Sequence, residues 1–170
     1  MVQRSRRGFI VRVECYRYSV GLALRTGGIP MSVQMVLLPV FVLVGLTFAL
    51  LLGMATARGR ALTERETSFK DIALGQPNWP TRTTQVGNCF SNQFEMPVLF
   101  YILIALALPL RHADLVIVML SWVFVVTRFA HAGIFVTSNN VRHRSAAWFA
   151  GVLVLFAMWL YFALKTLLLI

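Results

Sequence analysis

The sequence predicts an all-α membrane protein, built as a bundle of four transmembrane helices. Of its 170 residues, 58% are hydrophobic and only 13% are charged, whereas roughly 25% charged residues are usual in a soluble domain. The mean hydropathy is +0.74. A helix needs ~20 predominantly apolar residues to cross a bilayer, and four stretches of the chain reach or approach that length. An open sheet is excluded, because lipid offers no hydrogen-bond partners to its edges.

The first element is a basic segment, residues 1–31, that contains six arginines and no sustained apolar run. It ends in a Gly-Gly-Ile-Pro sequence at 27–30, followed by Met31. Two interpretations compete: the segment is a cytoplasmic tail, or Met31 is the natural start of the protein. We expect residues 1–31 to be disordered or a non-native start, and residues 32–170 to form the membrane domain.

The four helices of that domain are expected at about 33–57, 83–110, 113–138 and 144–169. The first apolar stretch is longer than the 7–15 residues of a signal-peptide core, so we interpret it as an uncleaved helix. In the second helix Pro97 removes a backbone N–H, which predicts a kink beside Glu95. The connection from Arg111 to Asp114 is short, so the second and third helices should be antiparallel neighbours.

The distribution of basic residues predicts the orientation. Lys and Arg collect in cytoplasmic loops of membrane proteins, and here they collect in the first and third connections. Both termini should then lie outside, which favours Met31 as the start, because an arginine-rich tail would otherwise cross the membrane. The basic residues are Arg58, Arg60, Arg65, Lys70 and Arg82 in the first connection, and Arg142 and Arg144 in the third.

The net charge of +10 is explained by the same basic connections. The sequence has no basic stripe with interleaved aromatic residues, so it does not indicate a nucleic-acid partner.

The two cysteines, Cys15 and Cys89, have no metal-binding spacing and form no disulfide framework. We expect no metal site and interpret Cys89 as a packed thiol. Four large aromatic residues are likewise interpreted as packing and interface residues: Trp122, Trp148, Trp159 and Tyr161.

Polar side chains interrupt the second helix at regular spacing. Asn88, Asn92 and Glu95 lie at i, i+4 and i+7 and therefore share a helix face. A charge near the bilayer centre costs at least ~2.5–3.5 kcal/mol on insertion scales, so such residues face the interior of a bundle and often serve a function.

The third helix carries a matching face with Arg128, His131 and Phe135. At 1.5 Å per residue, Glu95 lies ~22 Å before the second helix ends and Arg128 ~20 Å after the third begins. The two charges should therefore share a depth and pair. An alternative remains open: the Glu–Arg pair only locks the helices together, and the histidine is bonded to a carbonyl.

Together these faces predict a polar pocket near the cytoplasmic side, with Arg144 and Ser145 at its entry. Its mixed charges suit a small anionic, hydrogen-bonding ligand beside a lipophilic molecule from the bilayer.

The residues that line this pocket resemble the MAPEG family, the membrane-associated proteins of eicosanoid and glutathione metabolism. The similar segments are Asn92-Gln93-Phe94-Glu95, Arg128-Phe129-Ala130-His131 and Arg144-Ser145. The similarity covers about residues 32–170 and points to a prokaryotic-type member, and hence to a bacterial plasma membrane.

The resemblance implies a four-helix bundle that assembles as a homotrimer, with glutathione as co-substrate between subunits. It implies that glutathione is bound by Asn88, Asn92, Glu95, Arg128, His131 and Ser145, and that Arg144 is catalytic and activates the thiol, since a nearby cation raises the thiolate fraction. A glutathione-dependent transferase or peroxidase, acting on lipophilic electrophiles or hydroperoxides, would follow.

The chain also departs from the family pattern. Relatives that use glutathione carry arginines early in the second helix, where this sequence has Gln85 and Asn88, and a tyrosine where it has Phe135. A non-catalytic membrane protein that binds a lipid or a protein partner is therefore the alternative. A small proton-coupled exporter is less favoured, because an arginine at the same depth would hold Glu95 ionised.

Overall fold

The computed structural model describes residues 31–73, 75 and 78–168, and all regular secondary structure in this part is helical. The basic segment expected at 1–31 lies, except for Met31, outside the described residues. The elements are α2 (Val33–Thr63), α3 (Phe69–Ile72), α4 (Thr81–Ser91), the 3₁₀ turn η1 (Asn92–Phe94), α5 (Met96–Ala107), α6 (Leu115–Val136) and α7 (Val141–Leu167).

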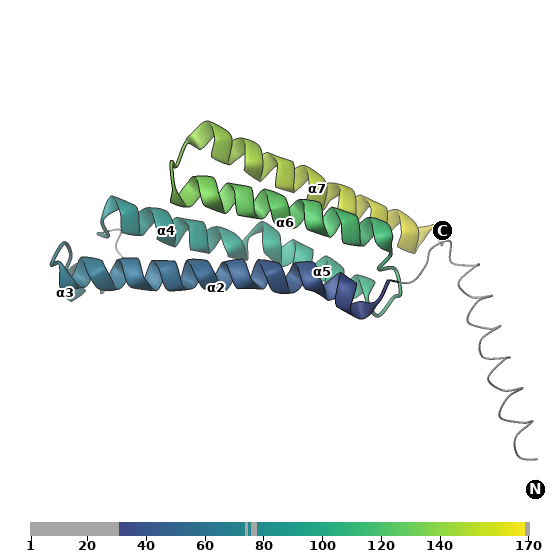
Figure 1. Ribbon diagram of the computed structural model, residues 1–170, viewed down its shortest axis with the longest axis horizontal. Helices are drawn as coiled ribbons and strands as arrows, with labels where there is room; N and C mark the ends of the chain where they lie inside the picture. Colours follow the sequence, from purple (N-terminus) through teal and green to yellow (C-terminus); the bar gives the residue numbers. More distant parts are fainter. Residues whose placement is uncertain (1–30, 74, 76–77, 169–170) are drawn as a thin grey trace, which may run out of the picture.

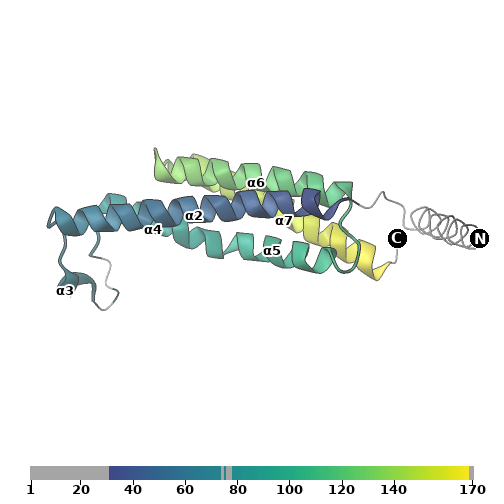
Figure 2. The same cartoon turned by 60° about the horizontal axis from the view of Figure 1, so that its bottom comes forward.

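Four long helical segments run side by side along one axis, as Figures 1 and 2 show. Each is long and apolar enough to cross a membrane: Val33–Thr63, Thr81–Ala107, Leu115–Val136 and Val141–Leu167. The prediction of an all-α bundle with four membrane-spanning helices is confirmed. α6 packs most extensively on α7, and α2 on α4.

The first helix continues past its expected end at residue 57. α2 begins after Ser32, whose hydroxyl accepts from the Met35 N–H at 3.4 Å, and continues to Thr63. Two residues after Thr63, Arg65 has a left-handed φ of 57° and ends the helical path of the chain. The Arg65 N–H donates to the Leu62 carbonyl at 3.2 Å, and the next N–H to the Ala61 carbonyl at 3.0 Å. These two bonds are the Schellman pattern that satisfies the last carbonyls of a helix.

The second span is broken rather than only kinked. α4 ends at Ser91, η1 follows, and α5 starts at Met96, with Glu95 between them at φ −99° and ψ −102°. Pro97 has no N–H for the bond that a continuous helix requires, but it is well tolerated in the first turn of a new helix. The second span, expected at 83–110, is therefore divided into α4 and α5, and the break lies beside Glu95, where the sequence predicted a kink.

The core lies between the middle parts of the spans. The Phe100 ring of α5 stacks on the Phe124 ring of α6 with centroids 5.0 Å apart, and Leu43, Ile117 and Met158 are fully buried around them. A smaller cluster near the α4 end contains Cys89, which is 0% exposed and forms no disulfide. The interpretation of Cys89 as a packed thiol is confirmed.

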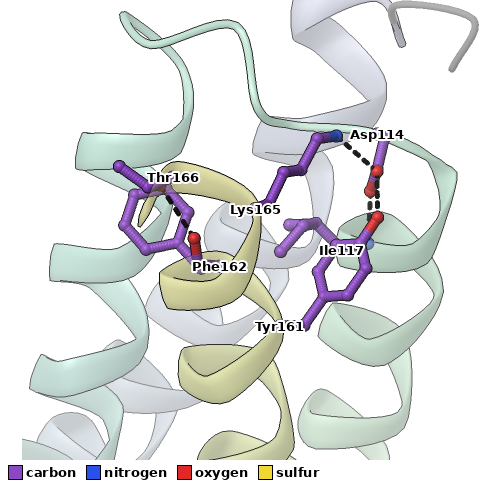
Figure 3. A network of polar contacts seen from close by, with 6 residues as sticks. All are labelled: Asp114, Ile117, Tyr161, Phe162, Lys165 and Thr166. Carbon is purple, nitrogen blue, oxygen red and sulfur yellow. Dashed lines mark hydrogen bonds and ion pairs between the residues drawn. The ribbon is translucent and has the colours of Figure 1, made fainter. Parts of the chain in front are cut away.

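A polar network holds the end of the bundle where α7 finishes (Figure 3). Asp114 caps α6 by accepting from the Ile117 N–H at 3.1 Å. It also accepts from the Lys165 ammonium at 2.6 Å and from the Tyr161 hydroxyl, both on α7. Burial disfavours ionisation of Asp114, but these donors outweigh it and hold its pKa below the usual value. Tyr161 was expected only to pack, and it is instead part of this network.

Candidate functional site

A cavity of about 400 Å³ opens between α4, α6 and α7 at the other end of the bundle. Its lining includes every residue that the sequence predicted for the site except Arg128. The lining residues are Asn88, Ser91, Asn92, Glu95, His131, Phe135, Arg144, Ser145, Trp148 and Phe149.

The α4 side of the cavity contributes the three polar residues predicted to share a face. Asn88 and Glu95 are exposed, and Asn92 is half-buried. The Asn92 amide donates to the Asn88 carbonyl at 3.0 Å, which satisfies one of the last carbonyls of α4 where the helix ends. The break after Ser91 leaves the Glu95 carboxylate on the cavity wall, without an ion pair in the described part of the chain.

On the α6 side, His131 is 4% exposed and only one of its ring nitrogens is bonded to the protein. Nδ1 lies 3.1 Å from the Arg144 carbonyl oxygen, and Nε2 is buried without a partner. Since a carbonyl only accepts, Nδ1 carries the proton, and Nε2 of the neutral ring is an acceptor. The bond to a carbonyl agrees with the structural alternative. His131 also lines the cavity, although its unbonded Nε2 is buried.

Arg144 is held at the cavity mouth by two contacts. Its Nη1 donates to the Asn139 side-chain oxygen at 2.5 Å, and its Cζ lies 4.1 Å from the centre of the Phe135 ring. An arginine above an aromatic face gains ~0.5–2 kcal/mol from the ring quadrupole. Phe135, one of the departures from the family pattern, therefore supports the guanidinium although it has no hydroxyl group. Asn139 adopts a left-handed φ of 49°, and the sequence analysis did not single it out.

The expected pairing of Arg128 with Glu95 is wrong. Arg128 is 2% exposed, does not line the cavity, and forms no ion pair with Glu95. Its Nη2 donates instead to the carbonyls of Ala147 and Trp148 on α7, at 3.4 and 3.2 Å. The residue shares the α6 face with His131, as predicted, but its side chain points into the α6–α7 interface. A proton-coupled exporter was disfavoured because Arg128 was expected to pair with Glu95, and the structure does not contain that ion pair.

Room for the Arg128 guanidinium comes from Gly151 on α7. A Cβ at this position would lie 2.9 Å from the Arg128 Cζ and 2.9 Å from the Thr127 Oγ1, closer than non-bonded atoms normally approach. Gly151 could not be predicted from the sequence, because a glycine in an apolar helix gives no indication of the side chain that faces it.

Gln85, a second departure from the family pattern, is engaged elsewhere. Its amide donates to the Phe135 carbonyl, and Arg82 donates to the Val136 carbonyl. These are among the last carbonyls of α6, which have no partner within their own helix. Gln85 thus fastens α4 to the end of α6, and it does not line the cavity.

Two aromatic residues complete the cavity wall. Trp148 and Phe149 line it from α7, and Phe149 is 60% exposed. Trp148 was expected only to pack, so its place on the wall corrects that interpretation. Among the described residues, no group of three His, Cys, Asp or Glu side chains could hold a metal ion.

Comparison with known proteins identifies the family. No curated protein and no solved structure matches the chain. The sequence model of the MAPEG family matches residues 36–164. This range includes the second and third spans, most of the first and fourth, and every residue of the cavity wall. The chain is therefore an integral membrane protein that belongs to the MAPEG family.

Proposed function

We propose that this protein binds glutathione in the cavity between α4, α6 and α7, and that it either transfers the glutathionyl group to lipophilic electrophiles or uses the thiol to reduce lipophilic hydroperoxides. The observation that carries the proposal is the convergence of Asn92, Glu95, His131 and Arg144 from three helices on one cavity of about 400 Å³. Ligand pockets commonly measure ~300–1,000 Å³ and combine apolar walls with a few convergent polar groups.

The polar groups of the wall complement those of glutathione. The Glu95 carboxylate suits an ammonium group, and the His131 ring forms part of the same wall. Arg144 uses one N–H for Asn139, and its guanidinium retains further donors for a carboxylate or a thiolate. Asn88, Asn92 and Ser145 add neutral hydrogen-bonding groups, and Phe149 leaves an apolar edge toward the lipid.

Arg144 is the residue to which we assign the chemical role. A cation beside a thiol favours loss of its proton to water and stabilises the thiolate. The thiolate sulfur then forms a bond to an electrophilic carbon as the leaving group departs. With a hydroperoxide it forms a bond to the terminal oxygen as the O–O bond breaks, the alkoxide takes a proton to give the alcohol, and a second glutathione thiol converts the resulting sulfenic acid to the disulfide and water. Ser145, next to Arg144 on the wall, can donate its hydroxyl hydrogen to the same sulfur.

Glutathione binding by purified protein in detergent, measured by calorimetry, tests the proposal. We expect saturable binding that Glu95→Gln and Arg144→Gln each weaken by about tenfold or more, because a charge-assisted hydrogen bond contributes ~1.5–3 kcal/mol. Arg111→Gln is the matched control, since Arg111 is exposed at the other end of the bundle. Absence of saturable binding at millimolar glutathione, or equal binding by all variants, would reject the proposal.

A second candidate is a non-catalytic protein that binds a lipid or protein partner in this cavity. Gln85 is occupied by α6 and Phe135 has no hydroxyl, so the cavity has fewer donors than glutathione-using relatives are expected to have. Glutathione binding without turnover of an aryl chloride or an organic hydroperoxide would favour this candidate.

We also propose, from family membership, that the chain assembles as a homotrimer, with its first and third connections in the cytoplasm of a bacterial cell. Native mass spectrometry from detergent measures the assembly. A predominant monomer or dimer would contradict it.

A further inference from the structure

The connection between α2 and α4 presents an apolar side chain outside the four spans. Phe69, the first residue of α3, is 75% exposed. It is the most exposed large apolar side chain outside the spans in the part of the chain that the structure describes, where Leu110 and Leu168 are 50% and 59% exposed. Single exposed apolar residues are common on soluble proteins, but this one lies at an end of a membrane-spanning bundle.

Hydrogen bonds link the described residues of the connection on both sides of α3. The Ser68 N–H and hydroxyl both donate to the Asp71 carboxylate, at 3.0 and 2.6 Å. The Thr67 hydroxyl donates to the Asn78 carbonyl at 3.0 Å, and the Asn78 amide donates to the Asp71 carbonyl at 2.7 Å. A four-residue helix is unstable alone, so these bonds are what fix the position of Phe69.

The length of α2 places the connection outside the hydrocarbon core of a bilayer. At 1.5 Å per residue, Arg58 is ~38 Å along α2 from Val33, whereas the hydrocarbon core is ~30 Å thick and the bilayer ~40–45 Å with its headgroups. The Arg58 Cζ lies 5.0 Å from the centre of the Trp79 ring, and tryptophan is enriched at this interface. Figure 2 shows α3 set apart from the bundle beside the last turns of α2.

The charge at this end is complementary to anionic lipid. Arg65 and Lys70 are exposed on either side of Phe69. Of the nearby acidic residues, Asp71 is engaged with Ser68, whose bonds hold its pKa below the usual value. The other end of the bundle has only Arg111 and Lys165 among its described Lys and Arg residues, and Lys165 is paired with Asp114. The described cations at the α3 end are Arg58, Arg60, Arg65, Lys70, Arg82, Arg142 and Arg144, against Glu64, Glu66 and Asp71.

We propose that the α2–α4 connection is a membrane-interface anchor that binds anionic phospholipids. Phe69 inserts beside the acyl chains at the level of the glycerol groups, while Arg65 and Lys70 bind headgroup phosphates. The anchor does not depend on the ligand of the cavity. It would fix the position of the start of α4, which supplies one wall of that cavity.

The insertion of Phe69 is tested with a fluorescent probe on the full chain in lipid nanodiscs. Cys89 is buried, so a Cys15→Ser background with Phe69→Cys gives one accessible thiol for an environment-sensitive label. Ser138→Cys is the matched control, because Ser138 is exposed in the α6–α7 connection at the same end. We expect brominated lipid chains to quench the label at 69 more strongly than the label at 138. A blue-shifted label at 69 that bromolipids do not quench would indicate contact with a neighbouring subunit and overturn the proposal.

The preference for anionic lipid is tested by native mass spectrometry with phosphatidylglycerol and phosphatidylcholine. Each of Arg65→Gln and Lys70→Gln should lower phosphatidylglycerol affinity about fivefold, which corresponds to the ~1 kcal/mol per basic residue typical near an anionic surface. Arg111→Gln at the other end should leave the affinity unchanged. Equal affinity for the two lipids, or equal losses in all three variants, would overturn the proposal.

Discussion

Replacing Gly151 by alanine tests how the buried Arg128 is held between α6 and α7. The added methyl group would lie 2.9 Å from the Arg128 Cζ. Arg128 is 2% exposed, so its guanidinium has no free space into which to move. We expect Gly151→Ala to push it away from the carbonyls of Ala147 and Trp148, which would leave a buried cation with poorer partners.

Two opposing effects set the size of the change. Overpacking a tight interior costs typically ~1–3 kcal/mol, and replacing a helical glycine by alanine gains up to ~1 kcal/mol. The net loss in the free energy of unfolding is then up to ~2 kcal/mol. For a chain of this size each kcal/mol changes the midpoint of thermal unfolding by about 2–4 °C, so a decrease of several degrees is expected.

The assay is thermal unfolding in detergent, monitored by circular dichroism at 222 nm. The signal at this wavelength measures the total helix content, so a cooperative transition gives one midpoint temperature. Gly45→Ala is the control, because no heavy atom lies within 4 Å of a Cβ added at Gly45 in the middle of α2. The control should unfold at or slightly above the wild-type temperature. If Gly151→Ala also unfolds at or above that temperature, Gly151 does not make room for Arg128 and the reasoning is refuted.

Two further predictions concern the ends of the bundle. Asp114→Asn should lower the free energy of unfolding by ~1–3 kcal/mol at pH 7, since hydrogen bonds to a charged group contribute about that much. Because the folded-state pKa of Asp114 is lowered, its stabilisation is complete above the unfolded-state pKa of ~3.9 and is lost as the pH falls through the folded-state value. The wild type, but not Asp114→Asn, should therefore lose this contribution below about pH 4 in acid-unfolding curves, and identical curves would contradict the assignment. Gln85→Ala should cost ~0.5–1.5 kcal/mol through loss of its bond to the Phe135 carbonyl, and an unchanged thermal midpoint would show that Gln85 does not fasten α4 to α6.

Helix periodicity correctly predicted which site residues lie on the same side of a span. Asn88 on α4 and Asn92, the first residue of η1, are four residues apart and line the same cavity. His131 and Phe135 are four apart on α6 and also line it. Glu95 lies on the wall as well, although η1 and the break beside it replace the continuous helix on which its spacing was calculated.

Arg128 shows where periodicity stops being informative. It lies on the predicted face of α6, and its depth was calculated to match that of Glu95. The rotamers of a long side chain can carry its charged group away from the helix face on which its Cα lies. The position that the group reaches depends on the space left by the side chains of a neighbouring helix. Gly151 provides that space on α7, more than twenty residues along the chain.

By itself, the sequence determined the fold class, the four spans and the polar faces, because an apolar solvent forces each span to be helical and turns polar groups inward. The tertiary structure decided which polar groups meet. It joined Glu95, His131 and Arg144 in one cavity, and it turned Arg128 to the carbonyls of α7. The physical reason is that hydrophobicity and helix period act within a segment, whereas a side-chain contact depends on the shape of two packed surfaces at once.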